Sequence, residues 1–396
     1  MSAGAGEISR NRPFGGPQIF RQGFRPFFLS AGIWGVAGVA LWLAVLLDAI
    51  SIPTAFAPAV WHAHEMIFGY AAAVIAGFLL TAIPNWTGRM PLQGLPLIVL
   101  FGAWLMGRAA MATSALIGDS LAAALDLSFL AILFAVVLRE ILSGRNWRNL
   151  PMPVAVGGLL LANLLTHAEA AGVLSSGAVG ERLGIAIITL LISLIGGRIV
   201  PSFTRNWLAK RSETDLPAAF GRFDRASLAI TLIALGAWVA APDTGVTGAA
   251  LIAAGISALF RLIRWRGQRT ISEPLVWSLH LGFLWVPAGL CLLGLGAFLP
   301  AYFPPMAGLH ALTVGAIGSM TLAVMTRATL GHTGRPLAAD GWTAAIYVLI
   351  AVAAALRVVA PVLPDAYGPP LWASGFIWIA AFSLFTVRFG RILIAR

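Results

Sequence analysis

The stretch WHAHEMIFGY, residues 61–70, places His62, His64 and Glu65 at the start of a long apolar run. Ionisable side chains are costly to bury in a membrane, so within an apolar span they are functional candidates. Imidazole is a common ligand of haem iron and of copper. These residue types therefore indicate a haem or metal site.

The pattern returns 246 residues later without a gap. The matches are His64 with His310, Gly69 with Gly315, Ala82 with Ala328, and Thr87-Gly88-Arg89 with Thr333-Gly334-Arg335. Side chains on facing helices of a bundle commonly hold a cofactor. We therefore expect His64 and His310 to be the two axial ligands of one non-covalent haem b. Chance recurrence of small residues in apolar sequence is the alternative explanation.

The other histidines suggest a second site. At 100° per residue, the side chains of His62 and His64 point some 200° apart on a helix, so they hardly serve one small site together. Copper suits imidazole ligands, and His62 with His167 is the first candidate pair. The alternative for His62 is an interfacial residue that is hydrogen-bonded to water.

Haem propionates need cationic or hydrogen-bonding partners. Arg108, Arg182 and Arg357 each lie near the predicted outer end of a span, outside the general charge pattern, and are the candidate partners. Contact with lipid headgroups explains these arginines equally well. Asp126 and His280 lie inside spans and could relay protons or simply join helices by hydrogen bonds.

The elements that position these residues are membrane spans. The chain of 396 residues is 59% hydrophobic and 10% charged, with a mean hydropathy of +0.88. Such a composition is typical of an integral all-α membrane protein. Cys291 is the single cysteine, which excludes an intrachain disulfide and a CxxCH haem attachment. The twelve expected spans are 26–50, 61–83, 92–113, 116–142, 151–172, 183–201, 224–241, 246–264, 274–298, 308–326, 342–362 and 370–391.

Arginine and lysine concentrate in alternate connections, which accounts for the net charge of +11 without a nucleic-acid partner. The positive-inside rule then predicts that both termini are cytoplasmic. We expect a cytoplasmic tail over residues 1–25 and a single membrane domain over residues 26–396.

A partial third copy of the pattern suggests three repeats of four helices. PNWT from Pro84 recurs as PSFT from Pro201, at an offset of 117 from the first copy. At that offset Glu181 replaces the histidine. The copies then fall on spans 2, 6 and 10.

Four motifs resemble the NnrS family of bacterial inner-membrane proteins. They are FRPFFLSAGIWG from Phe24, WHAHEMIFGYAAAVIAGFLLTAIPNWTGR from Trp61, GGRIVPSFTRNW from Gly196, and LHALTVGAIGSMTLAVMTRATLGHTGRPL from Leu309. The resemblance implies a multi-pass protein with twelve helices, containing haem and copper, in the bacterial inner (cytoplasmic) membrane. It also implies a role in the response to nitric oxide and nitrosative stress.

The chain is similar, more distantly, to the catalytic subunit of haem-copper oxidases. That family places low-spin haem ligands on spans 2 and 10, where His64 and His310 stand. Its copper-binding histidines on spans 6 and 7 and its second haem ligand on span 10 have no counterpart in this sequence. This departure argues against a complete dinuclear reductase centre.

Two functions follow as hypotheses. The first is a haem- and copper-binding membrane protein that acts on nitric oxide or its metal adducts, with an electron donor as a partner; an enzymatic activity stays open. The second is a proton-coupled secondary transporter without a redox cofactor, using Asp126 or His280. A transporter site is expected near the midplane, whereas His64 and His310 lie towards one face.

Overall fold

The computed structural model describes residues 15–175 and 177–395, and over these residues the chain is helical, without strands. Twelve helices are long and apolar enough to cross a membrane, which confirms the all-α, twelve-span prediction. The first span begins at Phe24, close to the expected end of the tail. Residues 1–14 of that tail lie outside the described part of the chain.

Nine spans are single helices, and spans 2, 6 and 10 each contain a wider π-helical segment. The single helices are α1 (Phe24–Leu46), α4 (Leu95–Ala112), α6 (Asp119–Ser143), α7 (Pro151–Ala170), α10 (Arg222–Ala240), α11 (Gly245–Ile263), α12 (Pro274–Gly296), α15 (Gly341–Val359) and α16 (Gly368–Ile394). Span 2 is α2 (Pro58–His64), η2 (Glu65–Ala71) and α3 (Ala72–Thr87); span 6 is α8 (Val179–Leu191), η4 (Ile192–Gly196) and α9 (Gly197–Ala209); span 10 is α13 (Pro305–His310), η6 (Ala311–Gly318) and α14 (Ser319–His332); the short α5 is Ser114–Ile117.

Spans 2, 6 and 10 are longer than the sequence predicts. They contain 30, 31 and 28 residues, whereas about 20 suffice to cross a bilayer. Polar residues at both ends interrupt the apolar run that the prediction followed, but the helix continues through them. These spans and span 9 are the four most buried, so the three related spans lie inside the bundle.

Local geometry supports the relationship between spans 2 and 10. The π-helical segments begin at Glu65 and Ala311, again 246 residues apart. Gly88 and Gly334, which follow the two spans, have left-handed φ values of 71° and 70°, a conformation that glycine adopts without steric cost. In span 6 the π-helical segment begins only at Ile192, ten residues beyond the position that the offset of 117 gives.

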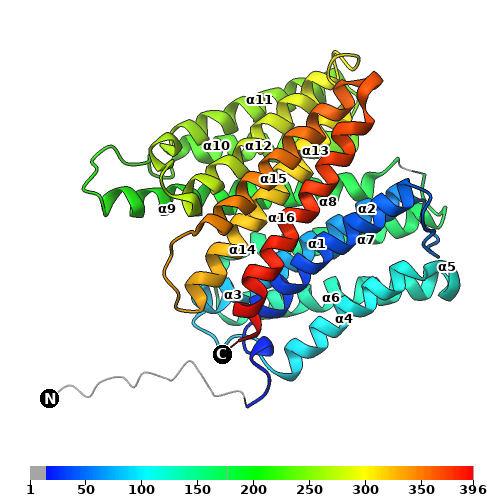
Figure 1. The fold of residues 1–396 in the computed structure, drawn as a ribbon, viewed down its shortest axis with the longest axis horizontal. Coiled ribbons are helices and arrows are strands. Elements are labelled where there is room, and N and C mark those ends of the chain that lie inside the picture. Colours follow the sequence, from blue (N-terminus) through cyan, green and yellow to red (C-terminus); the bar gives the residue numbers. More distant parts are fainter. Residues whose placement is uncertain (1–14, 176, 396) are drawn as a thin grey trace.

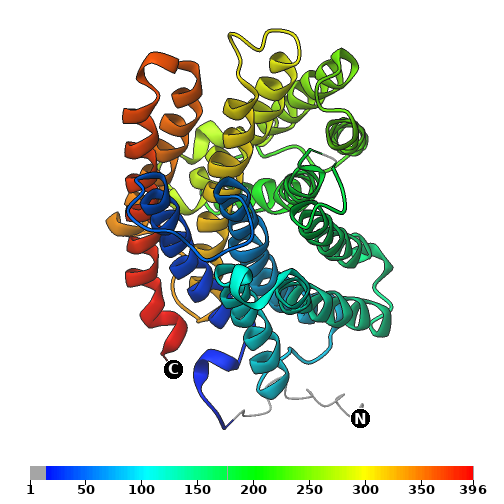
Figure 2. The ribbon, with the colours of Figure 1, turned by 90° about the vertical axis from the view of Figure 1, so that its right-hand side faces the viewer.

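The first and last spans pack side by side, which closes the bundle (Figures 1 and 2). Arg25 joins them, because its Nη1 donates hydrogen bonds to the carbonyl oxygens of Leu393 and Ala395, 2.9 and 2.8 Å away. The guanidinium thereby satisfies carbonyl groups that α16 leaves free at its C-terminal end. The start of α1 and the end of α16 consequently lie at the same end of the bundle.

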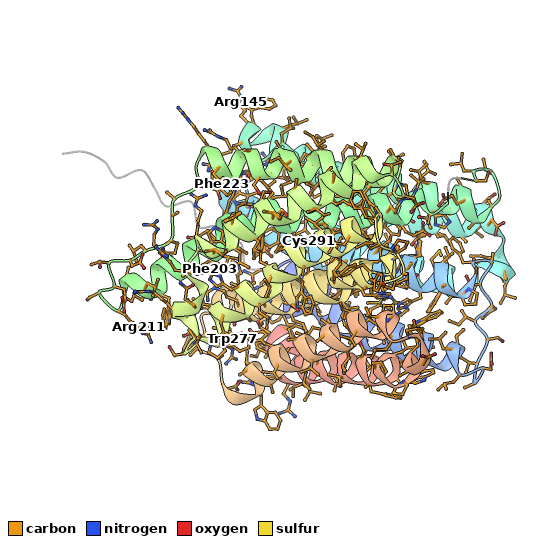
Figure 3. The ribbon with its side chains drawn as sticks, turned by 90° about the horizontal axis from the view of Figure 1, so that it is seen from above. Arg145, Phe203, Arg211, Phe223, Trp277 and Cys291 are labelled. Carbon is orange, nitrogen blue, oxygen red and sulfur yellow. The ribbon has the colours of Figure 1, made fainter. Side chains whose placement is uncertain are left out.

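Side chains fill the bundle in the pattern expected of a membrane protein. Arg145 and Arg211 project from its surface, whereas Cys291 lies within α12, part-way along the bundle (Figure 3). Large aromatic side chains such as Phe27, Phe283 and Phe385 are fully buried between helices. Van der Waals packing of this kind holds helices together in lipid, where apolar burial alone gives little driving force.

Candidate functional site

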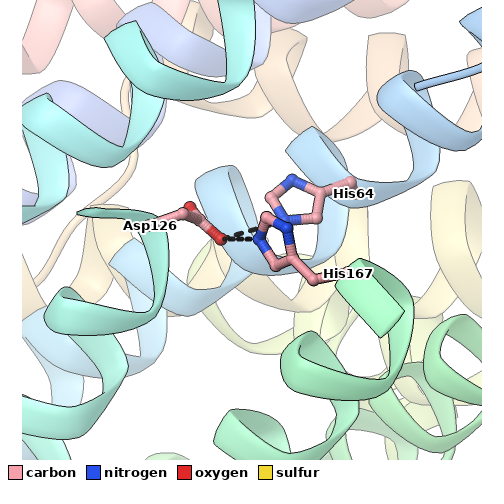
Figure 4. Close-up of side chains that lie close together, drawn as sticks. All are labelled: His64, Asp126 and His167. Atoms are coloured by element: carbon pink, nitrogen blue, oxygen red, sulfur yellow. Dashed lines mark hydrogen bonds and ion pairs between the residues drawn. The ribbon is translucent and has the colours of Figure 1, made fainter. Parts of the chain in front are cut away.

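A buried polar cluster lies near the predicted outer end of spans 2, 4 and 5. Asp126 Oδ2 accepts hydrogen bonds at its centre: Nε2 of His64 and Nε2 of His167 each lie 3.1 Å away, and Nδ2 of Asn163 lies 2.7 Å away. Figure 4 shows His64, Asp126 and His167 converging from three helices. The ligand atoms of these three residues lie within 4.8 Å of one another. Two imidazoles and a carboxylate in this arrangement can hold a metal ion.

Arg108 of α4 balances the acidic groups of this cluster. Its Nη1 lies 2.5 Å from Glu65 Oε1, and its Nη2 binds Asp126 Oδ1. Glu65 Oε1 also lies 3.3 Å from His64 Nδ1. A charged group buried in the membrane is costly unless it is paired. The cluster therefore offsets its own burial through mutual ion pairs and hydrogen bonds.

The helices fix the members of the cluster by simple spacing. Asn163 and His167 stand four residues apart on α7, so they share one face of that helix. His64 is the last residue of α2, directly before the π-helical segment η2. Such segments are frequent at functional sites, because the wider turn reorients the side chains beside it.

A separate cavity of about 730 Å³ opens beside this cluster, among the predicted outer ends of the inner spans. Its size falls within the 300–1,000 Å³ typical of cofactor and ligand sites. His62 and His310 both line it, together with Arg182 and Arg357. Aromatic walls come from Trp42, Trp238 and Trp378.

Several polar atoms around this cavity lack a protein partner. Among the described residues, Nδ1 of His62, Oε2 of Glu181 and Nη1 of Arg357 are buried without a hydrogen bond. Nδ1 of His310 lies 2.7 Å from the carbonyl oxygen of Met306 and donates to it, which leaves Nε2 as the unprotonated nitrogen. Buried polar atoms without partners require an explanation, and a polar ligand in the cavity supplies one.

The structure groups the histidines differently from the sequence-based pairings. His64 lies with His167 in the polar cluster, whereas His310 lies with His62 on the cavity wall. His64 and His310, the expected haem pair, therefore do not share one site. His62 and His167, the expected copper pair, do not share one either. The physical reason is the helix: residues two apart point in nearly opposite directions, so His62 and His64 meet different neighbours. His62 stacks on Trp42, with ring centroids 4.8 Å apart.

The three arginines expected to meet propionates also divide between the two sites. Arg182 and Arg357 line the cavity, as that expectation requires. Arg108 instead belongs to the polar cluster. Arg182 also donates hydrogen bonds to the carbonyl oxygens of Gly177 and Val239. Nη1 of Arg357, by contrast, has no hydrogen-bond partner among the described residues.

The residues proposed for proton coupling have different surroundings. Asp126 is the centre of the cluster described above. His280 lies apart from it, with its Nε2 2.7 Å from Thr204 Oγ1 and its Nδ1 without a partner among the described residues. Sequence reasoning missed the role of Glu65 and Arg108 in the cluster. The spacing of Asn163 and His167 did contain a signal, because residues four apart share one face of a helix.

A family model described as NnrS protein matches residues 18–396, nearly the whole chain. No curated protein and no solved structure matches the chain significantly.

Proposed function

The chain belongs to the NnrS family, and from that premise we propose that it is an inner-membrane protein of the bacterial response to nitric oxide that binds haem in the cavity between His62 and His310. Family membership supports the biological context. The single observation that carries the cofactor proposal is the cavity of about 730 Å³, which two histidines and two arginines line.

The residues present fit a haem. His310 offers Nε2, since its Nδ1 is engaged by Met306, and His62 has a buried ring nitrogen without a partner. Arg357 and Arg182 supply the positive charge that propionates require. Bound haem iron would supply a redox-active centre that binds small ligands. The protein's own contribution is to orient the two imidazoles and to surround them with tryptophan rings.

The polar cluster is the better site for copper. Asp126 Oδ2 lies 3.1 Å from Nε2 of both His64 and His167, close to the spacing of about 3–3.5 Å expected between ligand atoms that lie about 2.0–2.1 Å from one ion. A bound ion would take the place of the proton on Nε2 of His64, which faces Asp126. With both imidazoles neutral, Glu65 and Asp126 ionised and Arg108 protonated, the cluster then carries one excess negative charge. A monovalent copper ion on imidazole ligands would neutralise it.

The test of the haem proposal is the reduced-minus-oxidised visible spectrum of the detergent-purified protein, expressed with ample haem supply. We expect a b-type haem spectrum that is lost or shifted in His310→Ala and retained in His280→Ala. His280 is a matched control because it is a buried imidazole elsewhere in the bundle. A spectrum without haem in the wild-type protein would reject the proposal and favour the proton-coupled transporter.

A further inference from the structure

Three cavities follow one another along the inner spans 2, 6 and 10. The outer cavity described above reaches Ile185 on α8, and a small chamber begins one turn further along this helix, at Ile188. Beyond the chamber, an inner pocket of about 370 Å³ shares the lining residues Phe78, Ile199 and Val324 with it. The chamber therefore lies between two larger spaces on the axis of the bundle.

The residues that line the chamber are apolar except for Thr321. Its volume is about 90 Å³, and spans 2, 6 and 10 each contribute to its wall, for example through Val74, Ile192 and Val324. The hydroxyl of Thr321 borders the chamber but is already hydrogen-bonded to Tyr70 and to the carbonyl oxygen of Ile317. No unsatisfied polar group therefore faces the chamber among the residues that form its wall.

Physical chemistry restricts what such a space can hold. The chamber is several times larger than the roughly 10–15 Å³ needed for one water molecule, but a stable water needs two to four polar partners. Apolar cavities of similar size stay dry and bind small apolar molecules such as xenon. An ion would lose its hydration there without any compensating contact.

We propose that this chamber is a binding site for small, uncharged, apolar molecules of the size of a diatomic gas. The chamber lies among three of the four most buried spans and measures only about 90 Å³, so its size suits a free small molecule better than the acyl chain of a lipid. Molecules of this class dissolve in the bilayer better than in water. A site of this kind next to the outer cavity would raise their local concentration beside any centre bound there.

The experiment is xenon binding, measured as anomalous density in crystals of the full chain pressurised with xenon. We expect a xenon site in the chamber of the wild-type protein that Ile192→Phe removes by filling the space. The same substitution at Ile233, a residue of α10 that is 68% exposed on the outer surface, is the matched control and should leave the xenon site unchanged.

Two outcomes would overturn the proposal. One is ordered water, or no xenon, in the chamber of the wild-type protein; the other is a folded Ile192→Phe variant with unchanged xenon density. Since overpacking can prevent folding, Ile192→Ala gives a second test: it enlarges the chamber and should increase xenon occupancy severalfold. Unchanged occupancy in this variant would also count against the proposal. Xenon binding does not require haem, so this result is independent of the haem test.

Discussion

His62 and His64 face two different sites from nearly opposite sides of one helical turn. His62 lines the outer cavity, whereas His64 is fully buried beside Asp126 and His167. Ala63 between them also lines the cavity, and α2 ends at His64. One short helix thus supplies one imidazole to the space where we propose haem and another to the cluster where we propose copper.

The first prediction separates the two imidazoles by haem content. His62→Ala should remove or shift the b-type haem spectrum, because it deletes a histidine from the cavity wall. His64→Ala should keep the haem spectrum, because His64 contacts the polar cluster instead. The measurement is the pyridine haemochrome yield per mole of folded protein. Haem loss in His64→Ala together with an unchanged spectrum in His62→Ala would contradict this prediction and favour the pairing of His64 with His310.

The second prediction concerns copper in the cluster. Elemental analysis of purified protein loaded with Cu(I) should find copper bound to the wild type and depleted at least tenfold in His167→Ala. Removing one imidazole leaves an incomplete set of ligands around Asp126. His280→Ala is the control and should bind copper normally. Full copper binding by His167→Ala would place the metal elsewhere.

The third prediction concerns Arg108. Replacing it by glutamine should lower the free energy of unfolding by about 3–5 kcal/mol, because Glu65 and Asp126 would both lose the buried guanidinium that pairs with them. Thermal unfolding in detergent measures this change. The double variant Arg108→Gln with Asp126→Asn should lose less than the sum of the single variants. Arg145→Gln, at an exposed position, should change little.

The fourth prediction tests a close approach at Gly315, the repeat partner of Gly69. A Cβ atom at Gly315 would lie 2.5 Å from the Trp285 ring, too close for real contacts. Gly315→Ala should therefore lower the unfolding temperature, since the tryptophan or the backbone must shift. At Gly102 a Cβ atom would meet open space. Gly102→Ala should leave stability unchanged or raise it by up to about 1 kcal/mol.

The fifth prediction is a pH dependence at the start of span 11. Asp340 caps α15: its Oδ1 accepts hydrogen bonds from the Thr343 hydroxyl at 2.6 Å and from the Thr343 amide at 2.9 Å. The hydrogen bond from the Thr343 hydroxyl first, then the one from the Thr343 amide and then the Arg388 guanidinium hold the pKa of Asp340 below its usual value. A lowered pKa means that the carboxylate stabilises the fold above the unfolded pKa of about 3.9 and that this is lost as the pH falls through the folded pKa.

Asp340→Ala should accordingly cost about 1 kcal/mol at pH 7, the usual value of an N-cap. The difference in unfolding temperature between this variant and the wild type should persist at pH 5 and shrink below about pH 4. Asp365→Ala removes an exposed aspartate and controls for the change in net charge. A difference that stays constant down to pH 3 would show that the carboxylate's charge is irrelevant to the cap.

Most of the fold could be predicted from the sequence, because a membrane span is defined by length and hydropathy, which are local properties. The twelve expected spans all match helices of the structure. The gapless match of His64 with His310 also reflected a shared helix geometry, as the π-helical segments after both residues show. The ends of spans 2, 6 and 10 were missed because their last turns contain polar residues.

The candidate sites were harder to predict, because they depend on which faces of distant helices meet. The angle between His62 and His64 correctly indicated two sites. The short connection between α4 and α6 makes their contact expected, but the sequence does not show which faces meet and so does not bring Arg108 to Asp126. Sequence reasoning therefore found most of the chemical groups, whereas the structure groups the histidines in other pairs than the expected ones.

The π-helical segments bear on the ancestry of the chain. A π-helical turn contains about one residue more than an α-helical turn. If only one of the two repeat copies had acquired this extra residue, the two sequences would no longer align without a gap. Spans 2 and 10 stay in register from the histidine to the Thr-Gly-Arg ending, and both widen directly after the histidine. Duplication of one precursor unit that already contained the wide turn would account for this shared register, whereas span 6 carries its own wide turn at a different height.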